Sequence, residues 1–132
     1  RLEGAGMPSK TIMIVDDELN ILVPLQFLME QNGFRVVLAQ SGRDALEALE
    51  KSKPDLILLD IMLPDLDGYE IFQMIRANPA WDDVKVIFLT AKNRDGDIAK
   101  GLNLGVDAYV TKPFSNAEVL AAVNDLIGVA AQ

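Results

Sequence analysis

Four of the five short apolar runs in the sequence end in residues that could act together in phosphoryl transfer. In chain order these residues are Asp16 and Asp17, then Asp60, then Thr90 with Ala91, and finally Lys112. Neighbouring carboxylates repel one another, and a divalent cation removes that conflict. Mg²⁺ binds a few carboxylates together with water and phosphate oxygens, a lysine offers a point charge for phosphate, and an aspartate can become a phosphoryl acceptor.

The composition excludes most other kinds of site. The 132 residues include no cysteine and no histidine, which excludes thiolate sites, disulfides, imidazole bases and Ser-His-Asp catalysis. Any metal must be bound by oxygen, which points to Mg²⁺, Mn²⁺ or Ca²⁺. We expect Mg²⁺, with Mn²⁺ as an alternative. Phosphoryl transfer stays open because it depends mainly on positioning and charge neutralisation.

The chain is acidic, with 12 Lys and Arg against 20 Asp and Glu and a net charge of −8. A field of this sign repels nucleic acid and anionic membranes, so we expect neither as a direct partner. No apolar run approaches the ~20 residues that span a bilayer. We interpret residues 1–6 as an expression scar, Met7 as the native start and residues 7–132 as one cytoplasmic domain.

Apolar runs alternate with helical patterns along the chain. The predicted strands are Thr11–Val15, Arg35–Ala39, Leu56–Leu59, Val84–Leu89 and Ala108–Val110. The predicted helices are Ile21–Gln31, one from an N-cap at Ser41 through Lys51, Tyr69–Ala77, Asp95–Leu104, and one from Ser115 or Asn116 to Ile127. Because parallel strands need crossover helices, the pattern predicts an α/β fold with a doubly wound, five-stranded parallel sheet. Pro24 fits the first helix near its start, where amides lack partners.

Each site residue alone also has a structural explanation. An acidic pair after a strand is commonly a helix cap, a threonine at a strand end commonly completes the strand, and a lysine before proline is commonly a surface residue. Their joint occurrence at the ends of four strands favours a shared site instead, because such sheets bind ligands outside the carboxyl ends of their strands.

The segments around these positions resemble the receiver domains of response regulators in two-component signalling. The matching segments are Ile14–Glu18, Leu58–Gly68, Leu89–Lys92 and Gly105–Phe114. The resemblance covers about residues 11–127. It implies a flavodoxin-like fold with strand order 2-1-3-4-5, the order found in the chemotaxis regulator of this family.

The resemblance implies a role for each residue of the set. Asp60 would accept the phosphoryl group and Lys112 would pair with it. The hydroxyl of Thr90 and the backbone amide of Ala91 would bind phosphoryl oxygens. Tyr109 would be the switch residue, whose aromatic ring moves inward when Thr90 moves toward the phosphoryl group.

The metal ligands implied by the resemblance come from two loops. Asp17 would bind Mg²⁺ directly, Asp16 mainly through water, and Asp60 and the backbone carbonyl of Met62 would complete the protein ligands. Met62 and Lys92 occupy the two flanking positions that tune loss of the phosphoryl group in the family. Lys112–Pro113 would be a cis peptide bond.

The implied function is a signalling phosphoacceptor rather than an enzyme acting on external substrates. A histidine kinase or a histidine phosphotransfer protein would donate the phosphoryl group, and the response would alter an output face for an unknown partner. That face comprises residues 98–104, 106–110 and 118–127. The chain would be a monomer or a phosphorylation-dependent dimer. Two alternatives stay open, a small Mg²⁺-dependent phosphatase with an aspartyl-phosphate intermediate and a receiver-like module that no longer uses phosphate.

Overall fold

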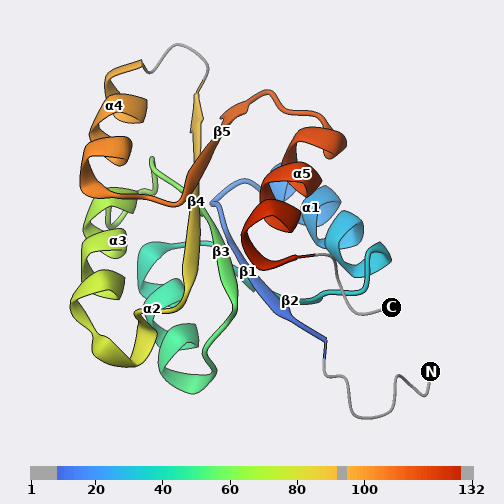
Figure 1. The fold of residues 1–132 in the computed structure, drawn as a ribbon, viewed down its shortest axis with the longest axis horizontal. Coiled ribbons are helices and arrows are strands. Elements are labelled where there is room, and N and C mark those ends of the chain that lie inside the picture. The colour runs from blue at the N-terminus through green and yellow to red at the C-terminus, as the bar shows by residue number, and fades with distance from the viewer. Residues whose placement is uncertain (1–8, 92–94, 129–132) are drawn as a thin grey trace.

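Five parallel strands form one sheet in the order β2-β1-β3-β4-β5, as the family resemblance implies (Figure 1). The computed structural model describes residues 9–91 and 95–128. The strands are β1 (Thr11–Val15), β2 (Arg35–Ala39), β3 (Leu56–Asp60), β4 (Lys85–Ala91) and β5 (Ala108–Lys112). The helices are α1 (Leu19–Gln31), α2 (Gly42–Lys51), α3 (Gly68–Ala77), α4 (Asp95–Leu104) and α5 (Asn116–Ile127), with an additional 3₁₀ helix, η1 (Pro79–Trp81), that the sequence did not predict.

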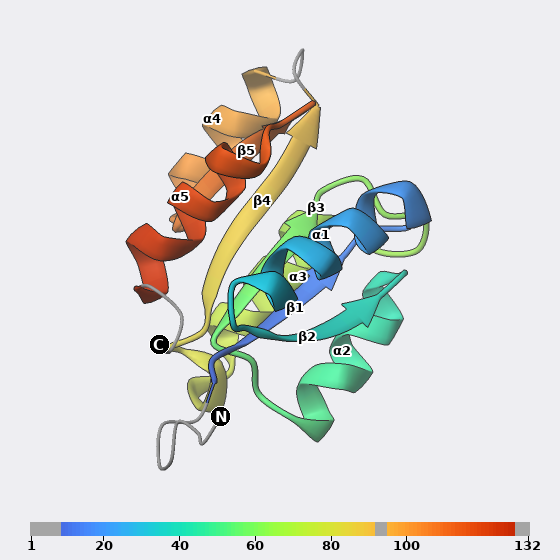
Figure 2. The ribbon, with the colours of Figure 1, turned by 90° about the vertical axis from the view of Figure 1, so that its right-hand side faces the viewer.

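The sheet is the middle of three layers. α1 and α5 cover one face, and α2, α3 and α4 cover the other (Figures 1 and 2). β3 is buried at all five positions, which confirms the prediction from its continuous apolar run. Alternate side chains of this strand enter two separate apolar cores, one on each face, because successive residues of a strand point in opposite directions. No helix in the described ranges is long and apolar enough to cross a membrane.

The three strands that carry Asp60, Thr90 and Lys112 extend further at their carboxyl ends than predicted, and β3 includes Asp60 itself. β4 continues to Ala91 and β5 to Lys112, and Thr90 pairs with Thr111 in the register between them. The apolar pattern stops before these residues, but a parallel ladder is built from backbone groups and does not depend on side-chain polarity. Thr90 and Lys112 are therefore held by the sheet itself and not by loops.

The first helix begins earlier than predicted. α1 starts at Leu19 instead of Ile21, so Pro24 lies inside it, and the expectation that Pro24 falls among amides without partners is wrong. Burial of an apolar face outweighs the lost backbone hydrogen bond. That face consists of four buried residues, Leu22, Leu25, Leu28 and Met29. Gly33 follows the helix end with a φ of 89°, a left-handed conformation that glycine adopts readily.

Short polar side chains begin several helices and fix the loop after β3. Ser41 caps α2 as predicted, and Ser115, not Asn116, caps α5. In the loop, Asp67 caps α3, while Asp65 accepts hydrogen bonds at 2.9 and 3.0 Å from the first two amides of α2. The segment that follows Asp60 is thereby tied to two helices.

Gly68 allows this loop to pass directly beneath the end of β3. Its amide donates a 2.8 Å hydrogen bond to the carbonyl of Ile61. A Cβ atom at this position would lie 2.7 Å from the Cα of Ile61 and 2.9 Å from the carbonyl oxygen of Asp60. Both neighbours are backbone atoms, so the contact could be relieved only by moving the chain at Asp60.

We expect Gly68→Ala to lower the free energy of unfolding by about 1–3 kcal/mol, because overpacking against backbone forces a shift. Urea denaturation at neutral pH measures this change. Gly96→Ala is the matched control, since a Cβ atom there meets nothing within 4 Å. A loss of stability no larger than that of the control would contradict the role assigned to Gly68.

Candidate functional site

The strand ends bring three carboxylates together at one edge of the sheet. Asp16 and Asp17 follow β1, and Asp60 is the last residue of β3, which is paired with β1. Each side chain offers an oxygen atom that lies within 4.8 Å of those of the other two. The cluster expected from the sequence is therefore present.

The ammonium group of Lys112 lies among these acids. Its Nζ atom is 2.8 Å from Oδ2 of Asp16, 3.7 Å from Oδ2 of Asp60 and 3.8 Å from Oε1 of Glu18. Lys112 thus donates its hydrogen bond to Asp16 and only approaches Asp60. The Lys112–Pro113 peptide bond is cis, as the resemblance implies.

The two aspartates after β1 differ in burial and in partners. Asp16 is fully buried. Its Oδ1 accepts a 3.0 Å hydrogen bond from the backbone amide of Glu18, and its Oδ2 accepts one from the side-chain ammonium of Lys112. Asp17 is exposed. Because both oxygens of Asp16 already have protein partners, Asp17 is the better placed of the two for direct contact with a metal ion.

The charges of the cluster act on one another. Burial raises the pKa of the Asp60 carboxyl above its ordinary value, and the adjacent aspartates add to this, against the opposing effects of the Met62 amide and Lys112. Burial by itself would lower the pKa of Lys112. The hydrogen bond to Asp16 and the nearby carboxylates outweigh burial, so the pKa of Lys112 is raised. Lys112 therefore stays charged, but its one positive charge does not balance the negative charges of the three carboxylates.

Thr90 contributes the only buried side-chain polar atom without a hydrogen-bond partner in the described parts of the chain. Its residue is 3% exposed, and its hydroxyl oxygen contacts no donor or acceptor. Nearly all buried polar groups in proteins are paired, so such a group calls for an explanation. It lies one residue beyond Leu89, the partner of Asp60 in the sheet register.

Other predicted residues are placed at the margin of the cluster. Tyr109 lies on β5 opposite Phe88 with 40% of its surface exposed, and it does not join the acids. Ala91 is exposed at the end of β4. Lys92 lies outside the described residues. The side chain of Met62 is 59% exposed, and its backbone amide donates a 3.1 Å hydrogen bond to Oδ1 of Asp60.

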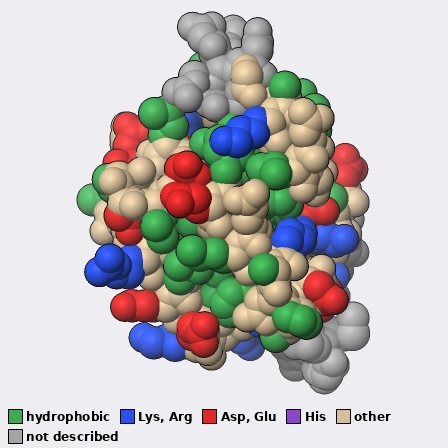
Figure 3. Space-filling view, turned by 90° about the vertical axis from the view of Figure 1, so that its left-hand side faces the viewer, with side chains coloured by type: hydrophobic (Ala, Val, Ile, Leu, Met, Phe, Trp, Pro, Cys, Tyr) green, Lys and Arg blue, Asp and Glu red, His purple; other side chains and the backbone are tan. Residues whose placement is uncertain are grey.

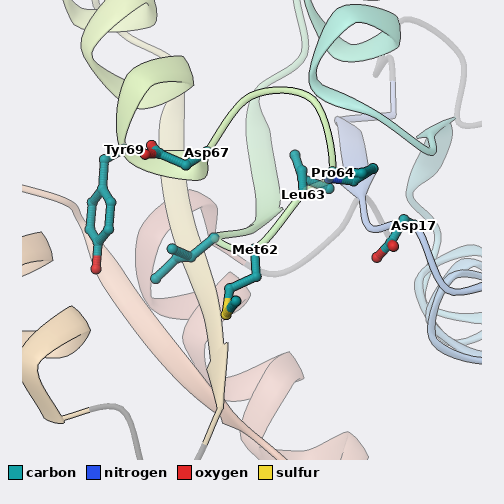
Figure 4. Close-up of a pocket in the computed structure, with 7 residues that line it drawn as sticks. Asp17, Met62, Leu63, Pro64, Asp67 and Tyr69 are labelled. Atoms are coloured by element: carbon teal, nitrogen blue, oxygen red, sulfur yellow. The ribbon is translucent and has the colours of Figure 1, made fainter.

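An open hollow of about 430 Å³ lies beside the acids (Figure 4). Asp17 stands at one end in this view and Tyr69 at the other, with Met62 between them. The other lining residues are Ile61, Leu63, Pro64 and Asp67. The sequence did not predict this hollow or the hydrogen bond from the Met62 amide to Asp60. Every residue except proline has a backbone amide, and the shape of a loop cannot be recognised from its residue types.

The donor set fits a magnesium ion. Three carboxylates at this spacing match the oxygen ligands of hard divalent cations, which also keep several waters. Asp16, Asp17 and Asp60 would hold the ion, and the ion would neutralise charge on phosphoryl oxygens.

Comparison with known proteins identifies the family. The sequence model of the response regulator receiver domain matches residues 12–124. The chain belongs to the response regulator receiver domain family. Receiver domains are signalling proteins that interact with histidine kinases and output domains, and the three aspartates fit their phosphoacceptor site.

Individual relatives agree with this assignment. The chain is 44% identical over 119 residues to the alkaline phosphatase synthesis transcriptional regulatory protein PhoP of Bacillus subtilis, covering 90% of this chain and 49% of that protein. Response regulator DrrB of Thermotoga maritima, an OmpR/PhoB homologue, matches with a TM-score of 0.80 and 37% identity over 91% of this chain and 53% of DrrB. A CheY-like receiver domain protein of Methanospirillum hungatei matches with a TM-score of 0.82 and 30% identity over 89% and 93% of the two chains. This receiver domain thus spans about half the length of PhoP.

We expect Thr90→Val to raise the free energy of unfolding by about 1 kcal/mol, because it removes a buried hydroxyl that has no partner while keeping the side-chain shape. Urea denaturation of the unphosphorylated protein measures the change. Thr111→Val, at the paired and partly exposed position on β5, is the control and should change stability less. Destabilisation by Thr90→Val would mean that the hydroxyl is satisfied in the folded protein.

Proposed function

We propose that this receiver domain accepts a phosphoryl group on Asp60 from a phosphohistidine of a histidine kinase or a histidine phosphotransfer protein. The supporting observation is the placement of the Asp60 carboxylate, which lies within 4.8 Å of two further carboxylates and 3.7 Å from the ammonium of Lys112. The donor histidine must come from another domain or molecule, because the 132 residues contain none.

The chemistry is a displacement at phosphorus. An oxygen of Asp60 forms a bond to phosphorus, the P–N bond to the donor imidazole breaks, and its electron pair stays with the imidazole nitrogen. Asp17, Asp60 and the backbone carbonyl of Met62 would hold Mg²⁺ directly and Asp16 mainly through water, and the ion would neutralise charge on the phosphoryl oxygens. Positioning and charge neutralisation provide most of the rate enhancement in such transfers, so no general base is required.

The response begins at Thr90. A phosphoryl group on Asp60 offers acceptor oxygens to its unpaired hydroxyl and to the amide of Ala91, and Lys112 pairs with the new charge. Movement of Thr90 makes room for Tyr109, whose ring is 40% exposed before the change. The output face formed by α4, β5 and α5 then shifts between two states, which changes its affinity for a partner.

A protein donor also needs a surface beside Asp60. Leu19, Val23 and Phe27 of α1 recur at intervals of one helical turn and are 60%, 54% and 62% exposed. This apolar stripe begins two residues after Asp17. Solvated apolar side chains in a row are typical of protein contacts, so the stripe is suited to a helix that carries the donor histidine.

Incubation with acetyl phosphate and Mg²⁺ should add a single phosphoryl group, seen as about 80 Da in the intact mass. We expect the adduct to be absent from Asp60→Asn and to require the metal, because chelation leaves the carboxylates unneutralised. Folded Asp60→Asn protein, checked by circular dichroism, is the control.

Three outcomes would contradict the proposal. An adduct that persists in Asp60→Asn would place the acceptor elsewhere. Continuous release of phosphate from a phosphoester without a stoichiometric adduct would favour the small phosphatase, and no adduct in folded, metal-bound protein would favour the module that no longer uses phosphate.

We expect Phe27→Ser to slow phosphotransfer from a histidine kinase about tenfold or more, because a large apolar anchor is lost from the contact. Labelling by acetyl phosphate should not change, since Phe27 is remote from the reacting atoms. Met74→Ser on α3 removes an exposed side chain, 45% exposed, that lies outside both the stripe and the output face, and it should leave both rates unchanged. Equal slowing of both donors would point to a folding defect instead of a docking role.

A further inference from the structure

A second apolar hollow lies on the opposite side of the molecule from α1. It has a volume of about 420 Å³ and is formed by Leu46 of α2, Met74 of α3 and Trp81 of η1. We call it the α2–α3 groove. Met74 is 45% exposed, while Leu46 and Trp81 are half-buried. Figure 3 looks onto this side and shows apolar atoms at the surface between charged side chains of both signs.

Three charged side chains of α2 border the groove. Arg43, Glu47 and Glu50 line it together with Asn78, and all three are exposed or at its rim. None of the three side chains takes part in an ion pair within residues 9–91 and 95–128. The chain thus carries one cation and two anions beside an apolar hollow without using them to stabilise its own fold.

The spacing of these charges suits a copy of the same surface. Arg43 and Glu50 are seven residues apart, which is two helical turns and places them on one side of α2. When α2 packs antiparallel to the α2 of a second copy, Arg43 of each chain faces Glu50 of the other. A two-fold interface requires such mutual pairing of one residue with another.

We propose that the α2–α3 groove is a dimer interface in solution, with a second copy of this chain as its occupant. The exposed Met74 of one copy enters the hollow of the other, where its flexible side chain fits against Leu46 and Trp81. The paired Arg43 and Glu50 flank this apolar centre and set the antiparallel register. The contact needs no phosphoryl group, so it is independent of the function proposed for Asp60.

The net charge of −8 does not prevent this association. Repulsion between exposed charges is largely screened beyond about 8 Å at physiological ionic strength. The three aspartates of the phosphoacceptor site lie at the carboxyl ends of the strands, whereas Trp81 precedes the first residue of β4. Charges beside the groove therefore decide the contact. Arg43 and Glu50 form two complementary pairs, while Glu47, which this register places near the two-fold axis, is exposed to solvent and leaves each rim with one net negative charge.

Sedimentation equilibrium of the full chain, carried to about 1 mM, tests the proposal. We expect a reversible dimer that is weakened about tenfold or more by Arg43→Glu and likewise by Glu50→Arg, since each change sets like charges against one another. The double variant R43E/E50R restores opposite charges and should recover the wild-type dissociation constant. Trp81 is the sole tryptophan, so its fluorescence should change with dilution in parallel.

The pair of single variants separates a specific contact from a net-charge effect. If only net charge mattered, Arg43→Glu would weaken the dimer and Glu50→Arg would strengthen it. Arg35→Glu on the exposed edge of β2 makes the same charge change as Arg43→Glu away from the groove and should have little effect.

A monomer at every concentration would overturn the proposal. So would a dimer that resists both charge reversals, or one that is lost in Phe27→Ser and kept in the groove variants, because each would place the contact on another surface.

Discussion

One electrostatic constraint organises the site: three acidic side chains share a partly buried edge of the sheet with the ammonium group of Lys112. Asp16 is fully buried and is tolerated there because Lys112 and a backbone amide satisfy both of its oxygens. Asp60 receives less compensation, and burial raises its pKa. The site is therefore short of positive charge, which favours a bound divalent cation and then a phosphoryl group stabilised by that cation and by the lysine.

The sheet order explains why the cation is a lysine. β5 is separated from β3 by β4, and neighbouring strands lie about 4.8 Å apart, so a group on β5 must cross roughly 10 Å to approach Asp60. The long stem of Lys112 reaches that far, and the strand end between them carries the small side chain of Ala91. A short cation carrier on β5 would not meet the carboxylates.

Packing behind Thr90 links the site to the face that would report its state. Phe88 lies two residues earlier on the same side of β4 and makes edge-on ring contacts with Tyr69 and with a second phenylalanine of α3. α4 rests on Phe88 through Gly101, where an added Cβ would lie 2.8 Å from the ring. The ammonium of Lys100, also on α4, lies 4.2 Å from the ring centre of Tyr69. A shift of β4 at Thr90 would be passed to α4 through this close packing, since tightly packed groups transmit displacement.

Sequence alone determined the fold class and the membership of the acidic cluster. Alternating apolar runs and helices permit few arrangements, and the carboxyl ends of parallel strands meet at one edge, so the sequence by itself predicts that Asp16, Asp17 and Asp60 lie together. The strand order came from resemblance to a family. Helix and strand limits were less accurate, because the start of α1 and the end of β5 are set by packing and backbone pairing and not by the apolar pattern.

Tertiary structure decided what depends on distance and burial. It gave Lys112 its hydrogen bond to Asp16 instead of Asp60, and it left the hydroxyl of Thr90 buried without a partner. It also supplied the amide of Met62 to Asp60. These features arise where segments far apart in sequence meet. The type of a side chain does not specify which oxygen a lysine will reach, or which hydroxyl will be buried away from water. The sequence therefore predicts which residues form the site, whereas the balance of charge among them is a property of the folded chain.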